Sequence, residues 1–375
     1  MTFIYSAKRT ALGGLNGQFV KSSAPELGAT AIKAACEGFD VAERIDEVLM
    51  GNVISAGIGQ APARQAALKA GLSEATPSVT VSKVCGSGMQ AIMSGMDQIK
   101  AGSSKLVIAG GMESMSLAPY LMDRARQGYR LGHGQLRDAM FVDGLEDAYS
   151  GKLMGLVAEQ VAAEHSFSRE ELDDYALLSL ERALAAQKSG AFVNEIAAHD
   201  GQADDEQPGN ARPDKIRQLR PAFSKEGVIT AANASSISDG AAALLIGTGL
   251  DAEPMAKIVA YSRHAGAPEQ FPIAPVYAVE KLMKSIGWSV ADVDLFELNE
   301  AFAMVALLPH KLLGVPLDKI NVNGGACALG HPLGCSGARI VVTLIHALRN
   351  RGLKRGIASL CIGGGEATAL AIELV

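Results

Sequence analysis

The sequence predicts an α/β protein with two similar layered halves, because one β-α-β plan occurs in it twice. The apolar strand 45–52 has a counterpart at 293–300, and both contain an asparagine near their ends. The strand 105–114, which runs into glycines, has a counterpart at 356–367. Alternating strands and helices favour parallel sheets covered by helices, so we expect two such halves packed together.

The spacing between strand and helix is also similar in the two copies. Ser87 follows Asn52 by 35 residues, and Ser336 follows Asn299 by 37 residues. Each serine lies in a glycine turn that enters a predicted helix. In open parallel sheets, the carboxyl ends of strands and the following helix starts share one edge, where ligands bind. We therefore expect polar residues of both copies to meet in one cleft.

The composition indicates a large globular protein and argues against several classes. The chain has 375 residues, of which 48% are hydrophobic and 20% charged, enough for a sizeable core. A net charge of −6 argues against a general nucleic-acid surface, and no apolar run approaches a membrane-spanning length of ~18 residues. Five widely spaced cysteines and a beginning without a signal-peptide pattern predict reduced thiols and a cytoplasmic location.

Cys85 lies where a predicted strand turns into a predicted helix. Residues 78–84 alternate like a strand, and residues 88–100 carry apolar side chains at helical spacing. Unpaired backbone N–H groups and the helix dipole at such a turn lower the pKa of a thiol and favour its thiolate. Gly86 and Gly88 leave room for a substrate to approach. Cys85 is therefore a candidate nucleophile, although a lone cysteine also suits a core.

The second half adds three candidates for the same cleft. His331 lies in a glycine-rich turn before Pro332 and a helix, where a core role explains it poorly. Cys361 ends one predicted strand, and Asn299 ends another. A thiolate beside an imidazole forms thioesters, and a second thiol moves protons, so this set fits acyl transfer. The backbone N–H groups of the glycine run that begins at Gly363 suit a developing oxyanion.

Two other interpretations of these motifs were weighed against acyl transfer. Residues 86–91 fit the G-x-G-x-x-A dinucleotide pattern, but Glu113 follows two glycines instead of ending the next strand. Cys327, His331 and Cys335 give C-x3-H-x3-C, which suggests zinc. Interrupting glycines and a proline spoil a common helical face, and no paired C-x2-C follows. We therefore expect neither a nicotinamide cofactor nor a metal site.

Residues 116–235 differ from both repeats and interrupt the first half. Within them, Ser168 and Glu171 form a capping box that begins a long helix. The predicted strand 240–247 then closes the first half. Insertions that follow strand ends commonly build substrate sites, so we expect this segment to lie over one half.

The segments VCGSGMQAI, NEAFA, GGACALGHPLGCSGAR and CIGGGEATA, in this order, resemble the signature segments of the thiolases. The resemblance runs almost from end to end. It implies the thiolase fold, with two repeated βαβαβαββ halves in a five-layer α-β-α-β-α arrangement and an inserted loop domain on the first half. The implied domains are an N-terminal half of residues 1–117 and 236–249, a loop domain of 118–235 that covers the CoA site, and a C-terminal half of 250–375.

The resemblance also implies a role for each reactive residue. Cys85 matches the nucleophile that becomes acylated, and His331 matches the residue that activates it. Cys361 matches the acid and base that moves a proton on the second substrate. Asn299 matches the residue that holds a water and forms one oxyanion hole with His331. The N–H groups of Cys85 and Gly363 match the second oxyanion hole.

Further positions match residues that bind substrate and CoA in relatives, namely Met154, Phe223, Ser235, Ala301 and Phe302. Three places depart from the family pattern. Leu153 stands where biosynthetic thiolases usually have histidine, which would admit a longer or branched acyl chain. Pro208 and Gly209 stand near the usual place of an arginine that contacts the CoA nucleotide, and Ser82 stands where asparagine is common. The cations that are candidates to replace the arginine are Arg212, Lys215 and Arg217.

The resemblance thus implies reversible condensation of two acetyl-CoA into acetoacetyl-CoA and CoA, by a ping-pong mechanism through an acyl thioester of Cys85. One alternative is a 3-ketoacyl-CoA thiolase that prefers longer or branched chains. Two more distant alternatives are a non-catalytic acyl-CoA-binding protein of the same fold and a decarboxylating condensing enzyme. CoA esters are substrates in this scheme, so no cofactor is expected. We expect a homodimer or homotetramer, with no nucleic-acid or membrane partner.

Overall fold

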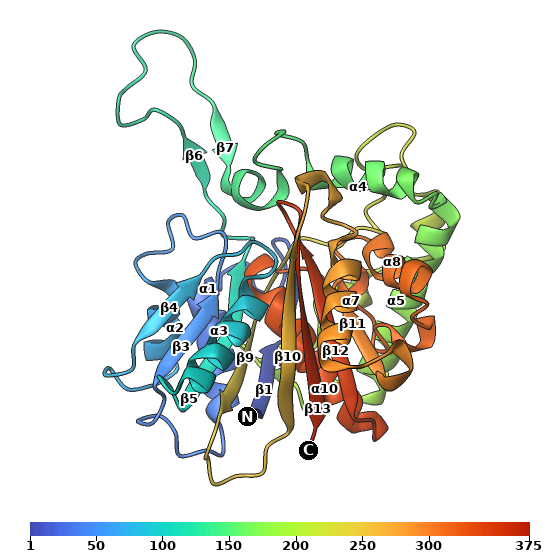
Figure 1. Cartoon of the computed structure of the whole chain (residues 1–375). Helices are drawn as coiled ribbons and strands as arrows, with labels where there is room; N and C mark the ends of the chain where they lie inside the picture. The colour runs from blue at the N-terminus through green and yellow to red at the C-terminus, as the bar shows by residue number, and fades with distance from the viewer.

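The computed structural model describes residues 1–375 and contains both predicted halves and the inserted segment (Figure 1). The first half contains β1 (Thr2–Thr10), β2 (Gly13–Gly14), α1 (Ala24–Cys36), β3 (Glu47–Gly51), α2 (Pro62–Lys69), β4 (Ser78–Val81), α3 (Ser87–Ala101), β5 (Leu106–Ser114) and β9 (Ser238–Gly247). The inserted segment contains β6 (Tyr120–Met122), β7 (Leu136–Asp138), the π-helical η1 (Phe141–Leu145), α4 (Met154–Glu164), α5 (Arg169–Ser189), β8 (Ile196–Ala197), α6 (Glu206–Asn210) and the 3-10 helix η2 (Pro213–Gln218).

The second half contains β10 (Ala256–Ala265), α7 (Ala274–Ile286), β11 (Leu295–Leu298), α8 (Ala303–Leu313), α9 (Ala326–Leu329), α10 (Leu333–Arg351), β12 (Arg355–Ile362) and β13 (Glu366–Leu374), together with the short 3-10 helices η3 (Pro268–Gln270), η4 (Val290–Asp292) and η5 (Leu317–Lys319). No helix has the combination of length and apolar character that crossing a membrane would need.

The strands of both halves form one continuous mixed sheet in the order β11-β12-β13-β10-β1-β9-β5-β3-β4. The halves meet where β1 pairs antiparallel with β10, over the three pairs from Thr2 with Ile258 to Ile4 with Ala256. Only β3 with β4, β3 with β5, and β11 with β12 are parallel along this path. The expectation of parallel sheets is therefore wrong for the centre, where β9 and β13 run antiparallel to both neighbours.

Helices occupy three layers around the strands. On the first half, α1 and α2 pack outside the strands, and on the second half α7 and α8 do so. Between them, α3 and α10 pack against each other and against strands of both halves. The apolar residues predicted at helical spacing in α3 all lie in this central cluster, namely Met89, Ile92, Met93, Met96 and Ile99. The structure thus has the five-layer α-β-α-β-α arrangement of the implied fold.

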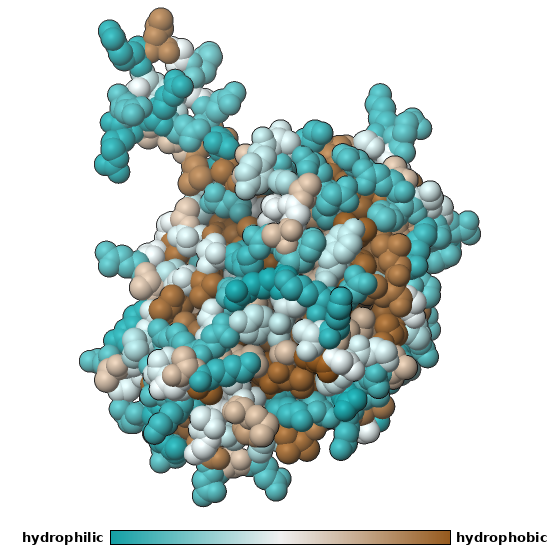
Figure 2. Space-filling model, viewed as in Figure 1, coloured by the Kyte–Doolittle hydropathy of each residue, from teal (hydrophilic) through white to brown (hydrophobic).

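The inserted segment packs on both halves, and its residues Glu195 and Asp205 join it to Arg9 of β1 in the first half. Its helices α4 and α5 share the large core cluster with α7 and α8. The predicted capping box begins α5, where Ser168 Oγ accepts from the N–H of Glu171 at 3.1 Å. The strands β6 and β7 form a separate hairpin that projects from the body in Figures 1 and 2.

The central helices α3 and α10 touch at their first turns, where glycines remove the side chains. A Cβ on Gly88 would lie 2.7 Å from the backbone nitrogen of Ala338. A Cβ on Gly337 would lie 2.5 Å from the backbone nitrogen of Met89. These are equivalent positions of the repeat, so the same requirement for glycine holds the starts of both helices together.

We expect Gly337→Ala to lower the free energy of unfolding by about 1–3 kcal/mol, because backbone atoms of α3 occupy the space of the new methyl group. The matched control is Gly209→Ala, where a Cβ meets nothing within 4 Å and a change within about 0.5 kcal/mol is expected. Urea unfolding followed by circular dichroism measures both. Equal stability of the two variants would contradict the close contact.

Candidate active site

The turn that carries Cys85 is held in an unfavourable backbone conformation. Val84 has φ of +44°, which is rare for a β-branched residue and costs about 1–3 kcal/mol. Ser87 stabilises the turn from the first position of α3. Its hydroxyl donates to the carbonyl of Val84 at 2.7 Å and accepts from the N–H of Lys83 at 2.8 Å. The strand-to-helix turn predicted at Cys85 is therefore confirmed.

This turn lies against the glycine loop between β12 and β13. A Cβ on Gly86 would overlap the side chain of Ile362, the last residue of β12. The ammonium of Lys83 pairs with the carboxylate of Glu366, the first residue of β13. One contact and one ion pair therefore fix the nucleophile turn of the first half to the glycine loop of the second half.

Burial, rather than the helix start, dominates the acidity of Cys85. It raises the pKa of the Cys85 thiol to about 11, and the nearby carboxylate of Glu113 also raises it. The backbone N–H groups of Gly363 and of Cys85 itself bond to the sulfur and lower the pKa by less. The expectation of a resting thiolate is therefore wrong, since desolvation disfavours the charged form.

His331 is buried, and its hydrogen bonds fix which ring nitrogen carries the proton. Its Nδ1 contacts Ser336 Oγ, and the hydroxyl of Ser336 donates to the carbonyl of Pro332 at 2.8 Å. Because a hydroxyl has one proton, Ser336 accepts from Nδ1–H of His331. The lone pair is then on Nε2, which lies 3.4 Å from Nδ2 of Asn299. His331 is thus oriented as a base on its Nε2 side.

The neighbouring titratable groups are also held neutral. Burial lowers the pKa of His331 to about 3, and the charge of Arg339 lowers it further. Burial raises the pKa of Cys361 well above its ordinary value, and the charge of Cys85 raises it too. The resting site is therefore a neutral imidazole with two neutral thiols, and any proton transfer must accompany a bond-forming step.

The structure brings the predicted reactive residues together at one edge of the sheet. Cys85 and His331 each lie two residues before a central helix, and the first turns of these helices touch. Cys361 lies in β12, two residues before Gly363, whose N–H bonds to the Cys85 sulfur. Asn299 follows β11, and its N–H donates to the carbonyl of Ser359 at 2.9 Å.

The predicted substrate-binding residues lie around the same point. A Cβ on Gly363 would lie 3.5 Å from the terminal methyl of Met154. The ring of Phe223 packs on Gly155 and meets Phe302 edge to face, with centroids 6.3 Å apart.

The remaining two predicted positions join the inserted segment to the second half. The N–H of Ser235 donates to the carbonyl of Ala301 at 3.0 Å, and Ala234 forms a β-bridge with Phe302. These backbone contacts place the end of the inserted segment beside the loop that follows Asn299.

A cavity of about 310 Å³ adjoins this loop and is lined in part by Arg212, Lys215, Ser236 and Cys327. The backbone N–H of His331 donates to the carbonyl of Ser236 at 3.0 Å, so this cavity lies beside the reactive residues. Of the three cations predicted to replace the usual arginine, Arg212 and Lys215 therefore lie on a cavity near the site. The third, Arg217, does not line it and pairs instead with Asp174.

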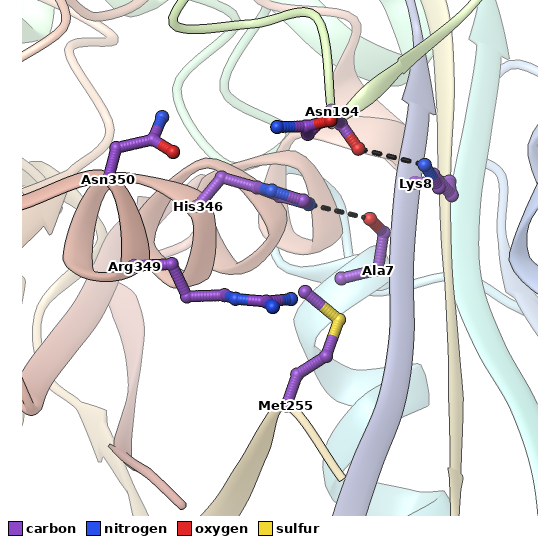
Figure 3. A pocket seen from close by; sticks show the side chains of 7 residues that line it. All are labelled: Ala7, Lys8, Asn194, Met255, His346, Arg349 and Asn350. Atoms are coloured by element: carbon purple, nitrogen blue, oxygen red, sulfur yellow. Dashed lines mark hydrogen bonds between the residues drawn. The ribbon is translucent and has the colours of Figure 1, made fainter. Parts of the chain in front are cut away.

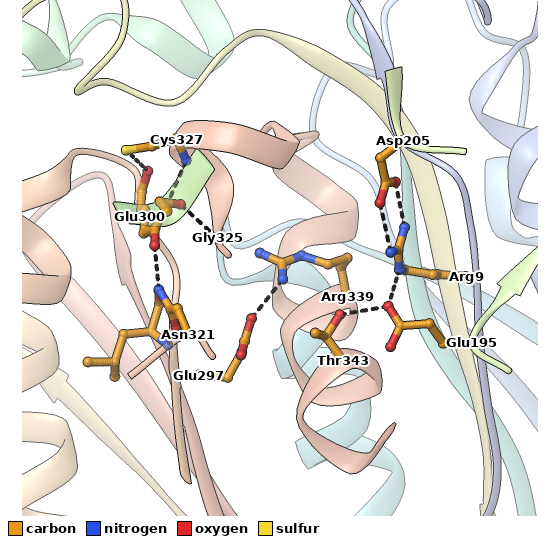
Figure 4. Close-up of polar contacts among 12 residues, drawn as sticks. Arg9, Glu195, Asp205, Glu297, Glu300, Asn321, Gly325, Cys327, Arg339 and Thr343 are labelled. Atoms are coloured by element: carbon orange, nitrogen blue, oxygen red, sulfur yellow. Dashed lines mark hydrogen bonds and ion pairs between the residues drawn. The ribbon is translucent and has the colours of Figure 1, made fainter. Parts of the chain in front are cut away.

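A buried carboxylate, Glu300, organises the loop that leads to His331 (Figure 4). It accepts hydrogen bonds from four donors: the hydroxyls of Tyr175 and Ser179, Nδ2 of Asn321, and the backbone N–H of Cys327. The N–H of Gly325 donates in turn to the hydroxyl oxygen of Ser179. Glu300 therefore ties the inserted segment to the α9 turn.

The C-x3-H-x3-C pattern does not gather in space as a ligand set. The thiol of Cys327 points to the carbonyl of Glu300 at 3.8 Å, whereas Cys335 packs in the apolar cluster between α3 and α10. No group of three or more histidine, cysteine, aspartate or glutamate side chains has the arrangement of a metal site.

Sequence reasoning missed the partners that orient the reactive residues. Glu113 was considered only as a nucleotide ligand, yet it accepts from Asn52 and from the N–H groups of Val53, Ile54 and Gly334. Ser336 was noticed only as a repeat position. The signal for it was its place in the first turn after His331, where a hydroxyl often bonds back to the preceding turn.

Comparison with known proteins identifies the thiolase family over almost the whole chain. Residues 2–249 match the family model described as thiolase, N-terminal domain, and residues 252–374 match thiolase, C-terminal domain. Acetyl-CoA acetyltransferases of Chromobacterium violaceum and Escherichia coli are each 48% identical, over 99% of this chain and 98% of theirs. The crystal structure of Acat5 thiolase from Ascaris suum in complex with coenzyme A matches with a TM-score of 0.95, at 40% identity and 100% of both chains.

We expect alkylation of Cys85 by iodoacetamide, without substrate, to keep accelerating up to pH 10. The thiolate is the reacting form, and its fraction rises about tenfold per pH unit below a pKa of about 11. Peptide mass spectrometry after timed quenching gives the rate at Cys85, and glutathione in the same tube serves as control. A plateau near pH 8 would show that the thiol is not desolvated as described.

Proposed function

The chain belongs to the thiolase family, and on that basis we propose that it condenses two acetyl-CoA into acetoacetyl-CoA and CoA, and also runs the reverse thiolysis. The observation that carries this proposal is the pair of neighbouring thiols, the half-buried Cys85 and the buried Cys361, which lies two residues before the Gly363 whose N–H bonds to the Cys85 sulfur. The curated relatives that carry the name acetyl-CoA acetyltransferase support the same reaction.

The first half-reaction makes the acyl-enzyme. The sulfur of Cys85 attacks the thioester carbon of acetyl-CoA while its proton moves to Nε2 of His331. The bond from carbon to the CoA sulfur breaks, and the CoA thiolate takes the proton from His331. The oxygen that becomes negative is stabilised by the N–H groups of Cys85 and Gly363, which already point at the sulfur.

The second half-reaction forms the carbon–carbon bond. The thiol of Cys361 gives its proton to Nε2 of His331 while its sulfur removes a proton from the methyl group of a second acetyl-CoA, and the resulting enolate attacks the acetyl group on Cys85. The bond from carbon to Cys85 breaks, that sulfur takes the proton from His331, and Cys361 keeps the proton that it removed from the substrate. The enolate oxygen is held by His331 and by a water on Asn299, whose buried Oδ1 has no partner within the chain.

This scheme needs no bound cofactor or metal, since the chain supplies the nucleophile, the bases and the oxyanion donors, and CoA esters are its substrates. Arg212 and Lys215 supply charge for the CoA phosphates at the mouth of the adjoining cavity. Cys85 and Cys361 must both remain free thiols, which supports a cytoplasmic location.

We also propose a homodimer or homotetramer. The edge strand β4 pairs only with β3 and exposes Val79, so a second copy can extend the sheet there. The projecting hairpin exposes Tyr120 and Leu131, a second surface on which copies can meet. Sedimentation equilibrium distinguishes a monomer from a dimer or a tetramer.

We expect Cys85→Ser to abolish the acyl-enzyme, and Cys361→Ser to form the acyl-enzyme without making acetoacetyl-CoA. The first change removes the thiol that carries the acetyl group, and the second removes only the base for the second half-reaction. Intact-protein mass spectrometry with acetyl-CoA detects the acetyl adduct, and a coupled assay follows the product. An acetyl adduct that persists in Cys85→Ser would contradict the assignment. A wild-type protein that forms neither an acetyl adduct nor acetoacetyl-CoA would favour a binding protein.

We expect thiolysis of acetoacetyl-CoA to exceed that of a six-carbon 3-ketoacyl-CoA and of a 2-methyl analogue in kcat/KM. Leu153, the residue before Met154, caps the start of α4 beside the site, and so it is the position most able to change this order. Leu153→His tests that influence, with Leu184→His on an exposed face of α5 as control. Preference of the wild type for the longer or branched substrate would instead make it a broader 3-ketoacyl-CoA thiolase. Turnover of malonyl thioesters alone would indicate a decarboxylating condensing enzyme.

A further inference from the structure

A polar cavity of about 450 Å³ lies at the far end of α10 from His331, between that helix and β1 (Figure 3). Lys8 of β1 and Arg349 of the last turn of α10 line it, together with the side chains of Asn194 and Asn350. His346 and Met255 complete its wall. At 1.5 Å per residue, Arg349 is roughly 24 Å along the helix axis from the first turn of α10, so this cavity is separate from the active site.

The cavity holds two cations without counter-ions. Neither Lys8 nor Arg349 takes part in an ion pair, and no acidic residue lines the cavity. The ammonium of Lys8 donates only to the backbone carbonyl of Asn194, at 2.8 Å. These unpaired cations face one cavity and create a local positive potential, although the net charge of the protein is −6.

The titratable groups around the cavity do not neutralise the positive charge of Lys8 and Arg349. His346 donates from Nε2 to the carbonyl of Ala7 at 2.9 Å, and burial keeps its ring neutral by lowering its pKa. Glu195, whose charge acts on His346, does not line the cavity and is engaged by Arg9 and by the hydroxyl of Thr343. The cavity therefore presents the charge of two cations beside the carboxamides of Asn194 and Asn350, the second of which donates one N–H to the carbonyl of Ala191 at 3.1 Å.

We propose that this cavity binds a small dianion, namely a phosphate group, free or carried by a small organic molecule. The guanidinium of Arg349 offers paired donors that match phosphate oxygens, and Lys8 supplies a second full charge. The volume exceeds what one phosphate needs, and Met255 gives an apolar wall for an organic part. The site would be occupied independently of CoA, because it lies at the opposite end of α10.

Isothermal titration of inorganic phosphate into the protein tests this proposal. The protein is first saturated with CoA, so that the phosphate-binding groups of the active site are already occupied, and ionic strength is kept low and constant with potassium chloride. We expect saturable binding of one phosphate per chain. Arg349→Ala is expected to weaken this binding at least tenfold, because it removes the paired donors.

The matched control is Arg44→Ala, which removes the same charge from an exposed residue outside the cavity and should leave the affinity unchanged. Lys8→Ala is a second test of the cavity, should Arg349→Ala alter the last turn of α10. A phosphate ester of glycerol that binds more tightly than phosphate would identify an organic ligand, and equal binding would identify free phosphate. No saturable binding, or equal affinity in wild type, Arg349→Ala and Lys8→Ala, would overturn the proposal.

Discussion

The contact between the first turns of α3 and α10 is the constraint on which the rest of the site depends. Gly88 and Gly337 allow the two backbones to approach so closely that a single methyl group has no space. Because Cys85 and His331 each precede their helix by two residues, this approach brings both turns to the same edge of the sheet. Burial of His331 and desolvation around the half-buried Cys85 keep the imidazole and the thiol neutral.

Such a buried centre requires every nearby charge to be paired or bonded, and the loops around it are arranged accordingly. Arg9 of β1 binds both Glu195 and Asp205, which ties the inserted segment to the middle of the sheet (Figure 4). Arg339 of α10 pairs with Glu297 of β11 through Nη1 alone, so this ion pair is the less complete of the two. Removing one partner of such a pair leaves an uncompensated buried charge, which typically lowers the free energy of unfolding by about 3–5 kcal/mol. These ion pairs therefore fix the positions of the loops that carry them.

The sequence allowed the general plan to be predicted because the repeat is periodic and local, whereas burial and side-chain partners depend on tertiary contacts. The helical spacing of Met89 and Met96 and the turn at Cys85 were predicted correctly. The antiparallel centre of the sheet was not, since β9 follows the inserted segment and β13 returns from β12 through a short glycine loop, so neither strand is reached by the helical crossover that the repeat suggested. The acidity of Cys85 was predicted with the wrong sign, because the pattern shows a helix start and not the surrounding desolvation. The place of Arg212 on a cavity required the structure itself.

In both halves, a serine hydroxyl at the start of a central helix donates to a carbonyl of the preceding turn, but the two turns carry residues with different chemical roles. The hydroxyl of Ser87 bonds back to Val84 and steadies the nucleophile turn. Its counterpart Ser336 bonds back in the same manner, and in addition accepts the Nδ1 proton of His331. Asn52 and Asn299 diverge similarly, since the amide of Asn52 binds Glu113 while that of Asn299 faces the imidazole. A duplicated helix start therefore supplies the same rigid support twice, and only the residue it supports decides whether that half contributes the nucleophile or the base.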